Sequence, residues 1–124
     1  MGKNILAVDD SPTMLASLQG MLERAGHHVK KAASAEEALA MLQSGCKPHL
    51  VITDYHMGAM NGIDLVRAVR KMAGFNFIPI LLVTTESQQD KRAAAKAAGA
   101  TGWLVKPVQP DALLQVIKQV VPGA

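Results

Sequence analysis

The sequence predicts an α/β protein built on one doubly wound sheet of five parallel strands, with five helices on its two faces. Three apolar runs rich in branched residues, at residues 5–8, 50–52 and 80–83, are continuous, as strands covered on both faces must be. Amphipathic stretches alternate with these runs along the chain. Because parallel crossovers are right-handed, this alternation places helices on both faces of the sheet.

The two remaining strands are expected at residues 29–32 and 101–105. Both are less apolar than the other three, and the polar His28 and Lys30 on either side of Val29 are typical of an edge strand. The flavodoxin-like order 2-1-3-4-5 puts the second and fifth strands at the two edges of the sheet. We therefore predict that order.

Several of the five helices have recognisable ends. Ser11 followed by Pro12 is typical of a helix start, and Gly26 can end that helix. Ser34 and Glu37 have the spacing of a capping box, which predicts the start of the second helix. The other helices are expected at residues 63–74, at about residues 88–98, and from residue 110 onward.

The composition favours one folded domain that covers residues 1–124. Hydrophobic residues make up 49% of the chain and charged residues 19%, which is enough apolar material for a core. No apolar run approaches the roughly 18 residues of a membrane span, and no signal peptide is recognisable, so we expect a cytoplasmic protein without a membrane partner. The net charge of only +3 and the few aromatics argue against a nucleic-acid partner. A single cysteine, Cys46, excludes an internal disulfide.

Polar residues follow four of the predicted strands at the point where each strand ends. Asp9 and Asp10 come after the first strand, Asp54 after the third, Thr84 after the fourth and Lys106 after the fifth. Ligands of open parallel sheets bind at the carboxyl ends of the strands. We therefore expect these side chains to lie together at one edge of the sheet.

These residue types in one place indicate phosphoryl-transfer chemistry. Carboxylates about 4 Å apart repel each other by about 4 kcal/mol per pair at an effective dielectric of about 20, so a cation must be present. A Mg²⁺ ion suits oxygen ligands, and Lys106 supplies an ammonium group that can pair with an anion. With a hydroxyl from Thr84, the set can stabilise an in-line phosphoryl transfer in which Asp54 is the nucleophile.

The arrangement resembles the receiver domain of two-component response regulators, in particular the single-domain chemotaxis type called CheY-like, over essentially the whole chain from residue 5 to about residue 121. The resemblance implies that Asp54 accepts a phosphoryl group from a histidine kinase. It also implies that Asp9, Asp10, Asp54 and the backbone carbonyl of His56 hold Mg²⁺.

The same resemblance implies roles for residues around the acceptor. Thr84 and Lys106 would contact the phosphoryl group, the Lys106–Pro107 bond would be cis, and Thr84 and Trp103 would form the switch that responds to phosphorylation. Two positions depart from the family pattern. Gly58 stands where the family commonly has Pro, and Trp103 stands where Tyr or Phe is usual.

Five further residues are candidates for modulation and output. The side chains of His56 and Glu86 could flank the path of a hydrolytic water and so set the lifetime of the phosphoryl group. Lys91, Arg92 and Lys96 make one face of the fourth helix basic. In the resembled family this region is the usual output surface, and here its charge favours an acidic or helical partner.

We therefore interpret the chain as a stand-alone receiver that catalyses only its own Mg²⁺-dependent phosphoryl transfer and hydrolysis and signals by protein contact. The resemblance implies a sensor histidine kinase as one partner. The downstream target would be a motor switch, a kinase or a phosphotransfer protein, and chemotaxis is the expected pathway. Three alternatives remain open: an aspartate-nucleophile phosphatase, a flavodoxin-like cofactor binder, and a receiver that works without phosphate.

Overall fold

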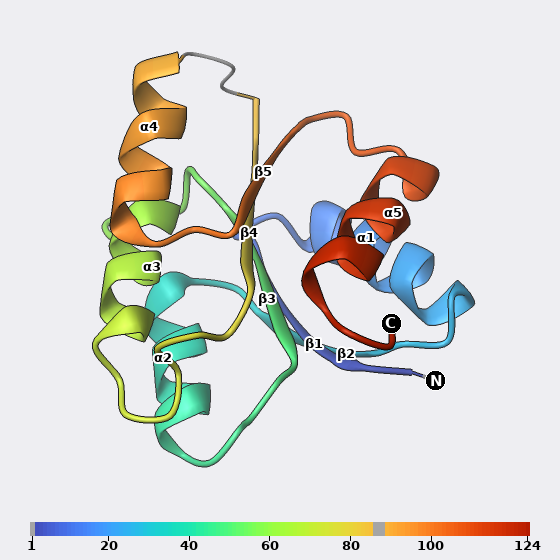
Figure 1. Cartoon of the computed structure of the whole chain (residues 1–124), viewed down its shortest axis with the longest axis horizontal. Coiled ribbons are helices and arrows are strands. Elements are labelled where there is room, and N and C mark those ends of the chain that lie inside the picture. Colours follow the sequence, from blue (N-terminus) through green and yellow to red (C-terminus); the bar gives the residue numbers. More distant parts are fainter. Residues whose placement is uncertain (1, 86–88) are drawn as a thin grey trace.

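The computed structural model describes residues 2–85 and 89–124, which form a three-layer α/β fold (Figure 1). Its sheet has five parallel strands in the order β2-β1-β3-β4-β5, which confirms the predicted order and the two predicted edge strands. The strands are β1 (Asn4–Val8), β2 (His28–Ala32), β3 (Leu50–Asp54), β4 (Ile80–Thr84) and β5 (Gly102–Val105). All residues of β3 and β4 are buried, whereas β2 and β5 are largely exposed or half-buried.

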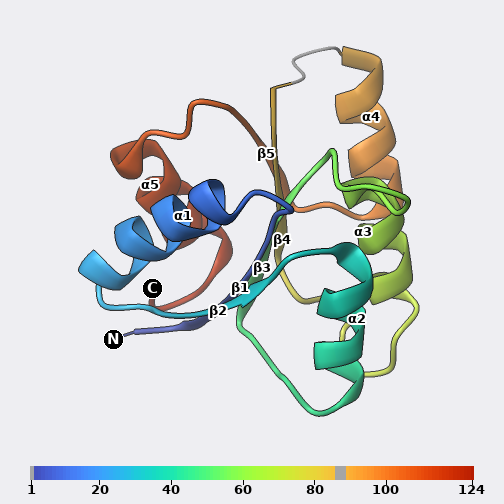
Figure 2. The same ribbon diagram turned by 180° about the vertical axis from the view of Figure 1, so that it is seen from behind.

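Helices cover both faces of the sheet, as predicted. They are α1 (Pro12–Arg24), α2 (Ala35–Gln43), α3 (Gly62–Arg70), α4 (Gln89–Ala98) and α5 (Pro110–Val120). Helices α1 and α5 lie on one side of the sheet and α2, α3 and α4 on the other, in the front view and from behind (Figures 1 and 2). None of the helices in the described ranges is both long and apolar enough to cross a membrane.

The core is divided into two clusters by the sheet itself. Because side chains alternate across a strand, Leu6 and Val8 pack in the cluster beneath α2, α3 and α4, while Ile5 and Ala7 pack in the cluster beneath α1 and α5. Each central strand therefore needs apolar side chains on both faces. This explains why its sequence is a continuous apolar run rather than an alternating one.

The predicted helix starts at the two serines are confirmed, but the third helix ends earlier than expected. The hydroxyl oxygens of Ser11 and Ser34 accept backbone N–H bonds at 3.2 Å and 3.0 Å. Helix α3 ends at Arg70 and not near Gly74, because the chain turns at once into a loop in which the Phe75 carbonyl accepts a bond from the Arg70 guanidinium at 3.1 Å.

His27 ties the start of β1 to the start of β2, and its bond depends on pH. The imidazole is 7% exposed, and its Nδ1 atom accepts the Lys3 backbone N–H at 3.0 Å, which requires a neutral nitrogen. Burial lowers the pKa of His27 below its usual 6.5, and the N-terminus, His28 and Lys3 act in the same direction. The unfolded chain therefore binds this proton more tightly than the folded chain, and stability is lost as the pH falls through about 6.5.

We expect His27→Asn to reduce the loss of unfolding free energy between about pH 7.5 and pH 5.5. The asparagine oxygen can accept the same backbone bond but does not titrate. Urea unfolding at several pH values measures the effect, and His28→Asn at the exposed neighbouring position is the matched control. If the unfolding free energy of His27→Asn fell with pH as much as that of the wild type, His27 would not be the cause of this loss of stability.

Candidate functional site

The four strand ends singled out in the sequence converge at the carboxyl edge of the sheet. Asp54 is the last residue of β3, and its register partner in β4 is Val83, so Thr84 lies one residue further along the neighbouring strand. The Lys106 backbone N–H donates to the Thr84 carbonyl at 2.8 Å, which fixes the chain after β5 beside the end of β4. The parallel register thus brings distant residues to one place.

Three carboxylates and one ammonium group form the centre of this edge. Carboxylate oxygens of Asp9, Asp10 and Asp54 all lie within 4.8 Å of one another. The Lys106 Nζ atom is 3.2 Å from Asp54 Oδ1 and 3.6 Å from Asp9 Oδ2. Asp9 and Asp54 are only 2% and 7% exposed, whereas Asp10 is open to solvent. The centre therefore combines buried acids with an opening on one side.

The electrostatics of the centre favour a divalent cation. Burial raises the pKa of Asp9, and the charges of Asp54 and Asp10 add to this, while a bond from the Ser11 N–H and the charge of Lys106 oppose it. One ammonium group cannot balance three ionised carboxylates. Clustered carboxylate oxygens with an opening to water are the ligand type that Mg²⁺ prefers, so the residues present fit this ion.

Comparison with known proteins matches this geometry to one family. Residues 5–118 match the family model described as "Response regulator receiver domain". The chain belongs to the response regulator receiver family. It is a CheY-like receiver of two-component signalling, and receivers of this type are signalling switches that interact with histidine kinases and downstream targets. This membership decides against the phosphatase and the cofactor-binding alternatives.

The similar proteins include chemotaxis regulators of the same size. Protein PilH of Pseudomonas aeruginosa is 39% identical, with 96% of this chain and 98% of that protein covered. Chemotaxis protein CheY1 of Helicobacter pylori is 36% identical, with 94% and 95% covered. Among solved structures, chemotaxis protein CheY4 of Vibrio cholerae superposes with a TM-score of 0.92 at 40% identity and covers 98% of this chain and 100% of its own.

The loop after Asp54 in this receiver is closed by its own backbone. The Gly62 N–H donates to the Tyr55 carbonyl at 2.8 Å, and the Met57 side chain is buried beneath the loop. Gly58 has a φ of +65°, which proline cannot adopt because its ring holds φ near about −65°. The loop thus follows a course that the proline common in the family would not allow. The Lys106–Pro107 bond is cis, as the resemblance implied.

Tyr55 connects the loop after Asp54 to Trp103, and sequence reasoning missed this contact. Its ring packs edge-on against Trp103, with ring centroids 6.3 Å apart, and against His56 at 4.6 Å. The ammonium group of Lys91 on α4 lies over the same ring, 5.0 Å from its centroid. An aromatic residue directly after Asp54 was the one signal in the sequence that could have indicated this contact.

The three cations expected on the output face of the receiver take two different positions. Arg92 and Lys96 line a pocket of about 530 Å³ together with Trp103. Lys91 is half-buried and reaches towards Tyr55 instead. His56 has an exposed side chain beside the site, and its expected companion Glu86 lies outside the described residues.

Proposed function

We propose that this receiver is controlled by phosphorylation of Asp54 by a sensor histidine kinase. The observation that carries the proposal is the ion pair between Lys106 Nζ and Asp54 Oδ1 at 3.2 Å, within a cluster of three carboxylates. A buried acid with an ammonium group beside it and an open side towards solvent can accept a group from outside and stabilise the added charge. The family and the chemotaxis relatives support the same function.

Asp9, Asp10, Asp54 and the backbone carbonyl of His56 would hold Mg²⁺. The ion supplies positive charge that offsets the negative charge of the phosphoryl oxygens. Among the proposed ligands, Asp9 is fixed by the bond from the Ser11 N–H to its Oδ1 atom at 2.9 Å. The second oxygen of Asp9, Oδ2, lies 3.6 Å from the Lys106 ammonium group.

In the proposed reaction an Asp54 carboxylate oxygen attacks the phosphorus of a phosphohistidine. The new P–O bond forms as the P–N bond breaks, and the electron pair of that bond stays on the histidine nitrogen. Lys106 exchanges its pairing with Asp54 for a pairing with a phosphoryl oxygen, and the Thr84 hydroxyl donates to another. Attack by water on phosphorus later returns the Asp54 carboxylate and releases phosphate. The side chains of His56 and Glu86 are proposed to modulate the rate of that hydrolysis.

Phosphorylation is proposed to shift an equilibrium between two conformations of the receiver. These conformations would differ at the Asp54 site and at the α4 surface, which is the face of α4 that carries Arg92 and Lys96. Thr84 and Trp103 would carry the change, with Tyr55 as the contact between the acceptor loop and Trp103. The surface that carries Arg92 and Lys96 would then bind an acidic partner. The proposed target is a flagellar motor switch, a kinase or a phosphotransfer protein, and the chemotaxis relatives support chemotaxis as the pathway.

The fluorescence of Trp103 tests this function because the chain has a single tryptophan. We expect Mg²⁺ to change its emission and acetyl phosphate to change it again in the presence of Mg²⁺. Asp54→Asn should abolish the second change, and removal of Mg²⁺ with EDTA should prevent it.

Asp111→Asn, which neutralises an acid in the first turn of α5, is the matched control and should respond like the wild type. An undiminished response to acetyl phosphate in Asp54→Asn would reject Asp54 as the acceptor. Absence of any response in the Mg²⁺-loaded wild type would favour a receiver that works without phosphate.

A further inference from the structure

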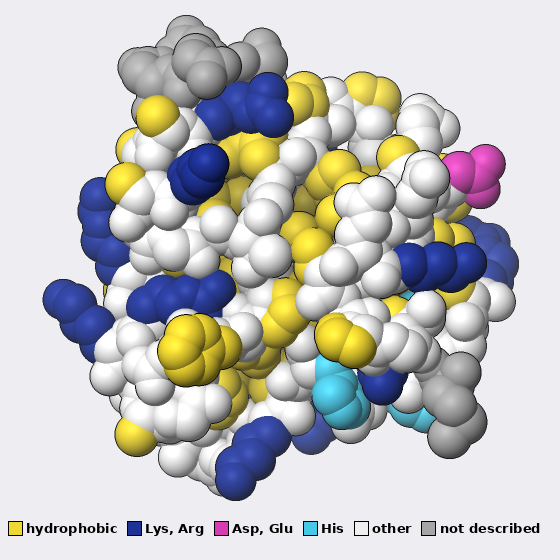
Figure 3. Space-filling view, in the orientation of Figure 1, with side chains coloured by type: hydrophobic (Ala, Val, Ile, Leu, Met, Phe, Trp, Pro, Cys, Tyr) yellow, Lys and Arg dark blue, Asp and Glu magenta, His cyan; other side chains and the backbone are white. Residues whose placement is uncertain are grey.

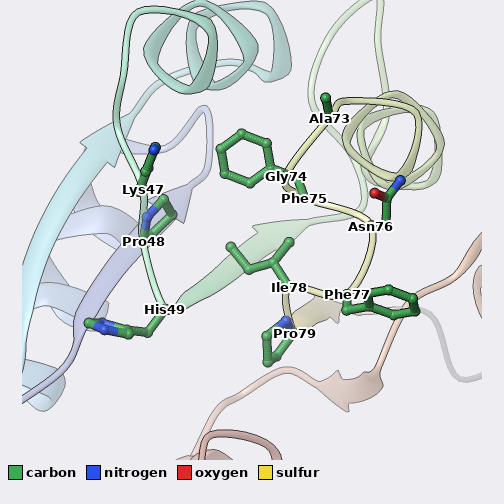
Figure 4. A pocket seen from close by; sticks show the side chains of 10 residues that line it. All are labelled: Lys47, Pro48, His49, Ala73, Gly74, Phe75, Asn76, Phe77, Ile78 and Pro79. Carbon is green, nitrogen blue, oxygen red and sulfur yellow. The ribbon is translucent and has the colours of Figure 1, made fainter.

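A further concave site lies at the other end of β3 from Asp54, where β3 and β4 begin. The loop from α2 to β3 and the loop from α3 to β4 enclose a pocket of about 480 Å³, within the range of about 300–1,000 Å³ typical of ligand sites (Figure 4). We call this pocket and its rim the basal surface. Its principal residues are Lys47, Pro48, His49, Phe75, Phe77, Ile78 and Pro79.

The floor of the basal surface is apolar, and an exposed aromatic stands at its rim. Phe75 is buried, and it faces Pro48 across the pocket, with Ile78 between the two loops (Figure 4). Phe77 is 95% exposed, and its ring points away from the other apolar side chains. Val105 on β5 is the only other large hydrophobic residue exposed in the described part of the chain, at 42%. The fold gains nothing from placing Phe77 in water.

Hydrogen bonds hold the loop that presents Phe77. The Arg70 guanidinium donates to the Phe75 carbonyl at 3.1 Å and to the Gly99 carbonyl at 3.0 Å and 2.8 Å. The Asn76 side-chain amide donates to the Arg70 carbonyl at 2.8 Å. The chain just before Phe77 is thus held in place before any partner arrives, which lowers the cost of ordering this loop on binding.

The charge around the basal surface has one sign. Residues 38–53 contain Lys47 and no acidic residue, and residues 70–85 contain Arg70 and Lys71 and again no acidic residue. Lys47 and Lys71 are exposed. Lys and Arg side chains are spread over the face seen in Figure 3, and in that view the coloured acidic side chains lie only at its right edge. An acidic partner complements this surface.

We propose that the basal surface docks an acidic segment of a partner protein. A large apolar side chain of that segment would fill the pocket over Phe75, and a second apolar part of the segment would cover the exposed Phe77 ring, since buried aromatic anchors dominate binding energy at interfaces. Carboxylates of the segment would pair with Lys47 and Lys71. The pocket lies before Leu50 and the acceptor after Thr53, at opposite ends of β3. The docking site is therefore distinct from the proposed acceptor site, and none of its lining residues belongs to α4.

A selection experiment tests the proposal even though the partner is unidentified. Random 12-residue peptides displayed on phage are selected on the wild-type protein, with counter-selection on Phe77→Ser. We expect the enriched peptides to carry a net negative charge and an aromatic or large aliphatic residue. An enriched peptide, made synthetically, should shift amide resonances of residues 47–49 and 71–79, and Phe77→Ala should weaken its binding by about tenfold or more.

Matched variants separate the basal surface from the rest of the molecule. Lys47→Glu should weaken binding of the peptide, whereas Lys118→Glu on α5 and Val105→Ala on β5 should leave binding unchanged. Asp54→Asn should bind like the wild type, which distinguishes this proposal from the proposed phosphorylation. Unchanged melting temperatures would show that Phe77→Ala and Lys47→Glu are folded.

Several outcomes would overturn the proposal. These are the absence of enriched peptides, enrichment without acidic bias, equal binding by Phe77→Ala, or resonance shifts confined to α4. Sedimentation of the wild type as a dimer that Phe77→Ala dissociates would assign the surface to a second copy of the chain. Binding to phosphatidylglycerol vesicles that Phe77→Ala abolishes would assign it to a membrane surface.

Discussion

Replacement of Lys106 by Met is expected to slow phosphorylation of Asp54 by acetyl phosphate by about 100- to 1,000-fold, the usual cost of losing one preorganised donor at a reacting centre. The ammonium group lies 3.2 Å from Asp54 Oδ1 and 3.6 Å from Asp9 Oδ2, so it is in place before the phosphoryl group arrives. Methionine keeps an unbranched, largely apolar side chain of nearly the same length but removes the charge. The rate is measured as incorporation of the radiolabelled phosphoryl group of acetyl phosphate, with acetate as the leaving group.

A second readout separates loss of the charge from a general disturbance of the site. Without the ammonium group the three carboxylates attract a cation more strongly, so Mg²⁺ should bind Lys106→Met at least as tightly as the wild type. Lys118→Met, at an exposed position on α5, should keep the wild-type rate. A rate in Lys106→Met close to that of the wild type would show that the ammonium group does not assist the transfer.

Gly62→Ala is expected to lower the free energy of unfolding by about 1–3 kcal/mol, because the added methyl group has no room. A Cβ atom at Gly62 would lie 2.5 Å from the Asp54 carbonyl oxygen and 2.5 Å from Leu82 Cδ2, closer than real side chains approach. Relief of this contact must move the backbone of Asp54 or the buried Leu82. We therefore also expect slower phosphorylation of Asp54.

Gly20→Ala in α1 is the matched control for this substitution. A Cβ atom there would have only the end of the Arg24 side chain nearby, at 3.7 Å. In a helix interior alanine is more stable than glycine by about 0.5–1 kcal/mol, so this variant should be more stable than the wild type. Urea unfolding compares the two variants. Equal free energies of unfolding for Gly62→Ala and the wild type would mean that there is room for a methyl group between Gly62 and the Asp54 backbone.

The strands and their order could be predicted because burial on both faces leaves a direct trace in the sequence. Runs such as residues 80–83 have no polar position, and the less apolar strands fall at the edges. The end of α3 could not be predicted in the same way. It depends on Arg70, whose guanidinium bonds reach the Gly99 carbonyl, 29 residues away in the sequence.

The centre of the site could be predicted because topology alone brings the ends of parallel strands together. Asp9, Asp54 and Lys106 needed no knowledge of side-chain conformation to be placed at one edge. The contacts of Tyr55 with Trp103 and Lys91 do depend on side-chain and loop conformation. The same is true of the basal surface, where two loops meet and neither carries a recognisable motif.

Identification of the phosphorylated residue tests the central claim most directly. The wild-type protein is incubated with Mg²⁺ and acetyl phosphate, digested under conditions that preserve acyl phosphates, and analysed by tandem mass spectrometry. One phosphoryl group on the peptide that contains Asp54, absent when Mg²⁺ is removed, is the result we expect. A phosphoryl group on another residue, or an unmodified Asp54 in folded protein with Mg²⁺ bound, would contradict the assignment of Asp54 as the acceptor.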